Sequence, residues 1–439
     1  MGRAALLAVF GLLVTAPVAV AAPPWSTPES VSSPTLFVSD PRVVFDSSGR
    51  AYATWRFSET WHVAVREPNA AEFGPERSAP NLVTPLFAHG FDRVLGLDQR
   101  ARGRRLVSLR ARVGRPDGSF GRPDTISTYE QANGYPSLAV FDRALVAWAQ
   151  QGARGRRIVR AAIRRGRAGF GRPVTLSGRG RAREFVAAAS AGVLFVAWER
   201  AGRIEARVRR IGRGWGPVRR IGPASRGSTT FRAAFSGRRG YLAWLARTNE
   251  SEVLRVAVLP TARTRFRAPQ TIATIERDPL TEAHGPVLVP IRERDALLAW
   301  TGWDGAAWRV RAAETGPGAR FGAPIDVSPP GEQAVLGDAG AVPASSEGVA
   351  VPHTVVVVWS RLDAVREVGD RIRAAVRLPG GTFGPPEDVS DLDRARLPDL
   401  AFDHRLHRWT AVWSQRMGPD QGVPQSQITT FLRFATRPG

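Results

Sequence analysis

Two residue types are missing from this sequence. Its 439 residues include no cysteine, and all 62 basic residues are arginine because there is no lysine. Without cysteine the chain forms no disulfide, even in an oxidising compartment, so its stability must come from buried area. Only 4 tyrosines and 2 methionines are present, against 44 glycines and 34 prolines. This bias is typical of a GC-rich genome, in which arginine codons are abundant.

Acidic residues are too few to balance the arginines, and the formal net charge is +23. Such a charge would suit nucleic acid or an anionic surface as a partner. Codon bias is the simpler explanation, and we predict no specific nucleic-acid partner. Heparin or DNA should then bind weakly at physiological salt, and more weakly as salt rises. Anionic envelope polymers remain candidate partners through an attraction that salt screens.

Long apolar runs are also absent, except near the start. Arg3 is followed by the run AALLAVFGLLV (Ala4–Val14) and by the small residues AVA (Ala19–Ala21). This order is typical of a signal peptide, and the run is short for a membrane span. We predict a signal peptide over residues 1–21 and a secreted, monomeric protein that does not span a membrane.

What the sequence does contain is an internal repeat. One recurring phrase begins with an aromatic residue and contains proline, as in FGRPVTLS at Phe170. Its other copies begin at Trp25, Phe73, Phe120, Trp215, Phe266, Phe321 and Phe383. A second phrase such as FVAW lies between them and ends at Trp55, Trp148, Trp198, Trp244, Trp300, Trp359 and Trp413. A degenerate copy, RVLGLDQ, has Leu97 where tryptophan is expected.

Each repeat consists of short runs rich in Val, Ile, Ala and aromatic residues, separated by Gly, Asp and Ser turns. Four such runs in a unit of about 50 residues predict an all-β protein, a single β-propeller of four-stranded blades. The phrases number eight, which predicts eight blades, or seven if the copy around Leu97 merges with a neighbour.

The two ends of the chain complement each other. WSTPESVS (Trp25–Ser32) matches FGPPEDVS (Phe383–Ser390), so the chain begins with a fourth strand that lacks its first three. The last repeat has three strands and lacks its fourth. We predict that the N-terminal strand completes the last blade, and that residues 22–439 form one propeller domain.

Two turns resemble those of a known family. GRPDGSF (Gly114–Phe120) and LPGGTF (Leu378–Phe383) are similar to the Asp-box turns of sialidase-like propellers, although neither has the full motif. The resemblance implies a propeller and leaves the activity open. The arginine triad and tyrosine nucleophile of that family cannot be matched to positions here, so no catalytic residue is carried over.

Residues that recur in every repeat are expected to be structural. The tryptophans of the second strands should pack one sheet against the next. Asp46, Asp142 and Asp403 should cap the turns between the first and second strands. The sequence has no Gly-x-Ser-x-Gly elbow and no His-Glu-x-x-His helix, and its 6 histidines are scattered. We therefore predict no cofactor, no metal and no assignable catalytic residue.

A binding site should instead lie where the repeat is broken. In a propeller the loops from strand four to strand one, and from strand two to strand three, share one face, and loops on a rigid scaffold carry function. The predicted ligand-binding residues in these loops are Trp61, Glu130, Tyr135, Glu282, His284, Trp303, Asp304 and Asp338. Aromatic faces and carboxylates suit a glycan. The leading hypothesis is a ligand- or partner-binding scaffold at the cell envelope, and the alternative is a glycan-cleaving hydrolase or lyase, which would need carboxylates from different blades to meet in the channel.

Overall fold

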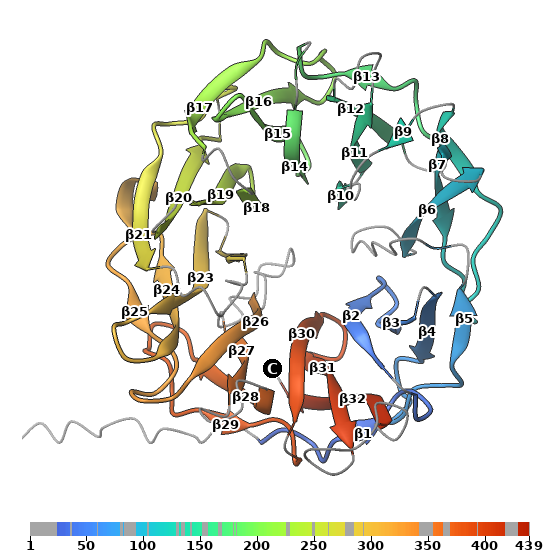
Figure 1. Cartoon of the computed structure of the whole chain (residues 1–439), viewed down its shortest axis with the longest axis vertical. Coiled ribbons are helices and arrows are strands. Elements are labelled where there is room, and N and C mark those ends of the chain that lie inside the picture. The colour runs from blue at the N-terminus through green and yellow to red at the C-terminus, as the bar shows by residue number, and fades with distance from the viewer. Residues whose placement is uncertain are drawn as a thin grey trace, which may run out of the picture.

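The chain folds into a ring of β-sheets. The computed structural model describes residues 24–438 with internal gaps, of which the longest are 83–93, 277–284, 342–353, 363–368 and 418–428. Eight antiparallel sheets surround a central axis (Figure 1). Besides strands, the described part has a short 3₁₀ turn at Pro317–Ala319. The protein is an eight-bladed β-propeller, which confirms the predicted fold and the count of eight over seven.

The first four blades follow one another along the chain. Within each, the strands run from the innermost to the outermost in chain order. Blade 1 contains β2 (Ser39–Phe45), β3 (Ala51–Phe57), β4 (Thr60–Arg66) and β5 (Arg77–Ala79); blade 2, β6 (Leu95–Arg102), β7 (Arg105–Val113) and β8 (Asp124–Thr128); blade 3, β10 (Ser137–Val140), β11 (Arg143–Gln151), β12 (Arg157–Arg165) and β13 (Val174–Thr175), with β9 (Gln131–Ala132) beside β11; and blade 4, β14 (Ala182–Ala189), β15 (Val193–Arg200), β16 (Arg203–Arg210) and β17 (Arg219–Pro223). The residues between β5 and β6 fall largely in the gap 83–93, so three strands of blade 2 are described.

The remaining blades continue the ring back to blade 1. Blade 5 contains β18 (Thr229–Ser236), β19 (Arg239–Arg247), β20 (Ser251–Leu259) and β21 (Gln270–Glu276); blade 6, β22 (Val287–Arg292), β23 (Asp295–Trp303), β24 (Trp308–Glu314) and β25 (Ile325–Asp326); blade 7, β26 (Ala334–Ala341), β27 (Val355–Leu362), β28 (Gly369–Arg377) and β29 (Glu387–Asp388); and blade 8, β30 (Ala395–Asp403), β31 (Arg408–Met417), β32 (Thr429–Pro438) and β1 (Glu29–Ser30). No helix among the described residues is long and apolar enough to cross a membrane.

Blade 8 joins the two ends of the chain, as predicted. Strand β1 is its outermost strand and pairs antiparallel with β32, with Glu29 opposite Phe434 and Ser30 opposite Arg433. The hydroxyl of Ser32 also accepts a hydrogen bond of 2.9 Å from the backbone N–H of Leu432. The N-terminal segment therefore covers an edge of β32 that would otherwise present unpaired backbone groups.

The strand-two tryptophans form the contacts between blades. All seven are at most 2 % exposed, which confirms their structural role. Strand β15 is buried along nearly its whole length because both of its faces are covered by neighbouring blades. Its Trp198 shares an apolar cluster with Leu145 and Ala147 of blade 3, and the indole N–H donates to Glu205 over 3.1 Å.

Blade 2 departs from this pattern, and the alignment of the repeats placed its exception one residue too early. Trp148 of blade 3 pairs with Arg160 across the strands, and the equivalent pair in blade 2 is Asp98 with Arg110. Asp98, not Leu97, therefore stands at the tryptophan position. Its carboxylate is fully buried and forms ion pairs of 2.7 Å with Arg110 and with Arg112. An ion-paired cluster occupies the place of the indole.

The turn aspartates behave as predicted where they are described. Asp46 accepts hydrogen bonds from the backbone N–H groups of Ser48 (2.9 Å) and Arg50 (3.1 Å). Asp403 caps the equivalent turn in blade 8 through the N–H of Arg405 (2.9 Å). Asp142 lies outside the described residues.

Candidate functional site

Four of the predicted ligand-binding residues lie outside the described part of the chain: Glu130, Tyr135, Glu282 and His284. The other four are Trp61, Trp303, Asp304 and Asp338. Trp61 and Asp338 lie within strands and not in loops as the sequence led us to expect, and Trp303 is the last residue of its strand.

Trp61 is a strand residue packed between two blades. It belongs to β4, is 6 % exposed, and clusters with Leu82 and Phe120 at the interface of blades 1 and 2. This is the interface where Asp98 replaces the strand-two tryptophan. Trp61 directly precedes His62, the residue paired with the strand-two Trp55. Other blades have a buried apolar residue at this strand-three position, such as Val159 and Ile204. Trp61 is therefore a core residue, and its predicted place in a loop is wrong.

Trp303 and Asp304 do lie where strand two turns into strand three, on the face expected for a ligand. Trp303 is half-buried against Trp308, with ring centroids 5.5 Å apart. Asp304 accepts hydrogen bonds from the N–H groups of Ala306 (2.9 Å) and Ala307 (2.8 Å), and these bonds lower the pKa of its carboxyl. Asp304 thus holds the turn that presents Trp303, and ligand binding by either residue stays a prediction.

Asp338 was expected in a loop, and the structure places it on β26, the innermost strand of blade 7. It pairs with Val358, the residue before the strand-two tryptophan. We call this strand-one position, opposite the residue before the tryptophan, the channel position. Its occupants in the described blades are Arg42, Ser137, Val186, Arg232, Val287, Asp338 and Asp399.

Local sequence explains how two of these side chains are presented. In blades 1 and 8 a residue with positive φ, Asp40 (51°) or Leu397 (55°), is followed by proline. The register with strand two shifts at this place, so each strand bulges just before Arg42 or Asp399. Proline suits a bulge because it has no N–H to contribute to the ladder.

Some channel-position side chains also tie consecutive blades together. The hydroxyl of Ser137 accepts a hydrogen bond from Ala187 N–H in blade 4 (3.0 Å). Asp338 accepts one from Leu400 N–H in blade 8 (3.1 Å), and Asp399 accepts one from Val43 N–H in blade 1 (2.8 Å). An oxygen at the channel position therefore satisfies a backbone donor of the next blade.

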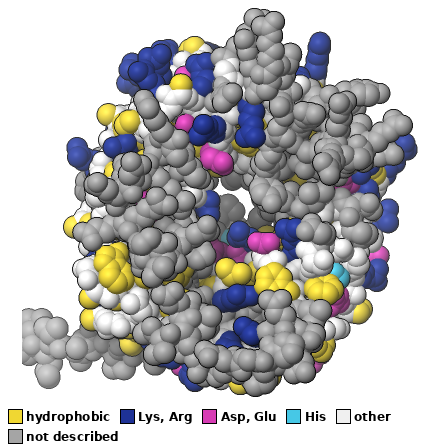
Figure 2. All heavy atoms as spheres, in the orientation of Figure 1, with side chains coloured by type: hydrophobic (Ala, Val, Ile, Leu, Met, Phe, Trp, Pro, Cys, Tyr) yellow, Lys and Arg dark blue, Asp and Glu magenta, His cyan; other side chains and the backbone are white. Residues whose placement is uncertain are grey.

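Arginine cannot accept such a bond, and the two arginines at the channel position point to solvent instead. The Arg42 side chain is 62 % exposed and forms a 2.8 Å ion pair with Asp399. Arg232 is also exposed, and among the described residues its guanidinium donates to the carbonyl of Phe231 (3.0 Å). These residues come from blades 1 and 5, on opposite sides of the ring (Figure 1). Figure 2 shows basic and acidic side chains together beside the opening at the centre of this face.

The four charged groups influence one another's protonation. Burial raises the pKa of Asp338 to about 7; the charge of Asp399 adds to this shift and Arg42 opposes it. The pKa of Asp399 is raised by burial as well, against the effect of Arg42. The pKa of Arg232 is lowered by burial and by the positive charge of Arg42. In a narrow channel, solvent reaches side chains that protein atoms still surround, so exposure and a burial effect occur together.

This arrangement can bind a charged or polyhydroxylated group. Two guanidiniums offer donors for carboxylate, sulfate, phosphate or hydroxyl oxygens, and Asp338 near its pKa can accept or donate. The sequence analysis missed Arg42, Arg232 and Asp399. A signal was present, because the channel position directly follows a proline in four repeats, at Pro41, Pro136, Pro286 and Pro398, and differs in each.

No family model matches the chain, and no curated protein matches its sequence. Among solved structures, the chain is similar to the K499G mutant of NanB sialidase from Streptococcus pneumoniae, with 10 % identity, 97 % of this chain and 72 % of that chain covered, and a TM-score of 0.39. It is also similar to the hemagglutinin-neuraminidase ectodomain of parainfluenza virus 5 (8 %, 72 % and 83 %, TM-score 0.35). A eukaryotic initiation factor matches too (10 %, 93 % and 93 %, TM-score 0.45). Likeness this distant does not bear on function.

Proposed function

We propose that the protein is a secreted propeller that binds an anionic glycan or polymer of the cell envelope at its channel. The observation that carries this is the channel position, which is charged in four blades, with arginine in two of them and aspartate in the other two. A position that serves only the frame repeats, as the strand-two tryptophan does. Arg42 and Arg232 would donate to the anionic group, and the surrounding loops would contact the rest of the ligand.

A glycan-cleaving hydrolase is the second candidate, and the pair Asp338 and Asp399 favours it. The two carboxylates come from adjacent blades, and a carboxyl with a pKa near 7 suits a general acid. However, Asp399 is buried, with one oxygen bonded to Arg42 and the other to Val43 N–H. It could attack a substrate only by giving up the contact between blades 8 and 1, so binding is the better-supported function.

The experiment is a glycan and envelope-polymer array probed with residues 22–439, with reducing-end release assayed on each ligand that binds. Binding without release is the expected result. For a bound ligand, Arg232→Gln should weaken affinity roughly tenfold, because one charge-assisted hydrogen bond is lost. Trp303→Ala is compared with Arg232→Gln, because it tests whether the loops contribute to binding.

Three outcomes separate the hypotheses. If Trp303→Ala weakens binding and Arg232→Gln does not, the loops carry the site and the channel proposal is wrong. Release of reducing ends that Asp338→Asn abolishes would establish the hydrolase instead. If no anionic ligand binds, the proposed function is rejected.

A further inference from the structure

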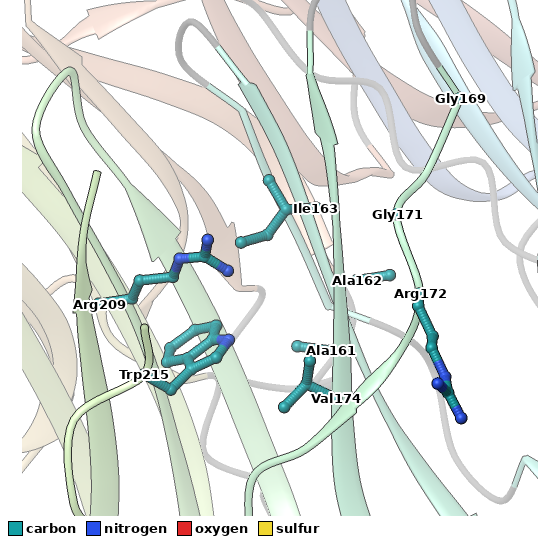
Figure 3. A pocket seen from close by; sticks show the side chains of 9 residues that line it. All are labelled: Ala161, Ala162, Ile163, Gly169, Gly171, Arg172, Val174, Arg209 and Trp215. Atoms are coloured by element: carbon teal, nitrogen blue, oxygen red, sulfur yellow. The ribbon is translucent and has the colours of Figure 1, made fainter. Parts of the chain in front are cut away.

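A cavity of about 390 Å³ lies on the outer wall between blades 3 and 4, far from the channel position in the strand order of each blade. Its lining includes Ala161, Ile163, Val174, Arg209 and Trp215. Figure 3 shows the Arg209 guanidinium, the Trp215 indole and the Ile163 side chain pointing into the same space. The cavity combines an apolar wall, an aromatic face and a positive charge.

The same place in two other blade pairs is closed by a polar side chain. Val174 pairs with Ala161, and its equivalents are Asp124, opposite Ala111, and Gln270, opposite Val256. Asp124 accepts a hydrogen bond of 3.1 Å from the backbone N–H of Phe170 in the next blade. Gln270 likewise accepts one of 3.0 Å from the N–H of Phe321. An acceptor at this strand position thus satisfies the N–H of the aromatic residue that opens the next blade's outer strand.

Between blades 3 and 4 this acceptor is missing. Trp215 is the equivalent aromatic residue, because it forms the same isolated bridge with Arg209 that Phe170 forms with Arg164. Its N–H therefore faces Val174, which cannot accept and is 40 % exposed. Within the described part of the chain, the Trp215 N–H has no acceptor.

A third blade pair shows what this place can hold. Between blades 7 and 8 the position of Val174 is occupied by Glu387, opposite Ala374, and Glu387 forms a 2.7 Å ion pair with Arg437. Arg437 occupies the strand position in blade 8 that Arg209 occupies in blade 4, four residues after the partner of the strand-two tryptophan. A carboxylate at this place is therefore within reach of both an arginine and a backbone N–H.

We propose that the cavity binds a small organic carboxylate with an apolar or aromatic body, independently of the channel site. The carboxylate takes the place that Asp124 and Glu387 fill in other blades, accepting from Trp215 N–H and from Arg209. The body of the ligand packs on the Trp215 indole and against Ile163 and Val174. A carboxylate fits better than a neutral group because hydrogen bonds to a charged acceptor are stronger.

The test compares two probes that differ only in charge, N-acetylphenylalanine and its uncharged amide. Titration of residues 22–439 by calorimetry should show the acid binding roughly tenfold or more tightly than the amide. Equal affinity for the two would show that charge recognition is absent and would overturn the proposal, as would failure of the acid to bind at millimolar concentration.

Variants then locate the site. Val174→Asp supplies the missing acceptor as in blade 2 and should abolish binding of the acid, while Ile325→Asp adds the same charge at the equivalent, 46 % exposed position of blade 6 and should leave it unchanged. Thermal unfolding checks that each variant folds. Val174→Gln, which copies Gln270 of blade 5, replaces Val174→Asp if the latter does not fold, and undiminished binding in a folded Val174 variant rules the cavity out.

Discussion

Two neighbouring positions in each blade, one on strand two and one on strand one, differ in how much their residue type varies from blade to blade. The strand-two tryptophan occurs in seven blades and is buried in all of them. The channel position, opposite the residue just before it, changes from arginine to serine, valine or aspartate around the ring. The first position meets the same environment in each blade, namely the apolar face of the preceding sheet. The second faces a shared channel, where each blade contributes to one common surface and no two need contribute the same group.

The comparison teaches that residue type varies in two settings within the repeat. Arg42 and Arg232 vary at a position that faces solvent, where their guanidiniums are accessible to a ligand although Arg42 also pairs with Asp399. Trp61 differs in residue type from its equivalents Val159 and Ile204, but like them it is buried in the core. Absence of repetition alone therefore does not mark a site. It marks one only where the side chain is also accessible.

The largest effect is expected from removing the strand that closes the ring. Deleting residues 22–33 takes away β1, the buried Val31 and the Ser32 hydroxyl that accepts from Leu432. The deletion exposes the edge of β32 and should lower stability more than any single substitution. Thermal unfolding of the deletion against residues 22–439 measures it. An unchanged melting temperature would mean that β1 does not hold the ring together.

A core tryptophan should follow in size. Trp198→Ala leaves a cavity between blades 3 and 4 and removes the indole N–H that donates to Glu205, so we expect a loss of about 3–5 kcal/mol in the free energy of unfolding. Trp303→Ala should cost clearly less, because Trp303 is half-buried at the end of its strand. Chemical denaturation of both variants decides this. Comparable losses of stability in the two variants would show that Trp303 is as much a part of the packed core as Trp198.

The smallest effect concerns pH and the channel position. The pKa of Asp338 is about 7 in the folded protein, against about 3.9 for an unfolded aspartate. Between these values the folded state binds more protons, so the stability that this group contributes at low pH is lost as pH rises towards 7. Wild type should lose up to about 1 kcal/mol per pH unit relative to Asp338→Asn over this range. Parallel stability curves between pH 4 and 7 would show that Asp338 has an ordinary pKa.

Much of the frame could be predicted from the sequence. The repeat predicted eight blades with seven as the alternative, the matching ends predicted the pairing of β1 with β32, and the recurring tryptophans and turn aspartates had the expected structural roles where they are described. These features repeat, so each copy supports the others. The candidate site could not be predicted in the same way, because the residue type at the channel position changes from blade to blade and the copies do not support one another.

Register was the other limit. In the degenerate copy RVLGLDQ, an alignment by hydrophobicity assigns Leu97 to the tryptophan position, whereas cross-strand pairing assigns Asp98. A shift of one residue sends a side chain to the opposite face of a sheet, and a local pattern cannot reveal that two arginines of the next strand neutralise a buried carboxylate. Asp338 was predicted in a loop for another reason: the stretch Pro329–Gly340 was interpreted as an insert between strands, whereas β26 begins at Ala334.

The sequence by itself determined the architecture, because hydrophobic periodicity and turn residues act over a few residues and recur in every unit. Only the tertiary structure decided which side chains meet. Arg42 and Arg232 come from opposite sides of the ring, and Asp338 and Asp399 from adjacent blades, yet closure of the ring brings their charges together at one axis. The cavity beside Trp215 is likewise lined by residues of two blades, with Val174 from one and Arg209 and Trp215 from the next. Contacts between residues that do not repeat depend on where distant segments pack, and the local sequence does not show them.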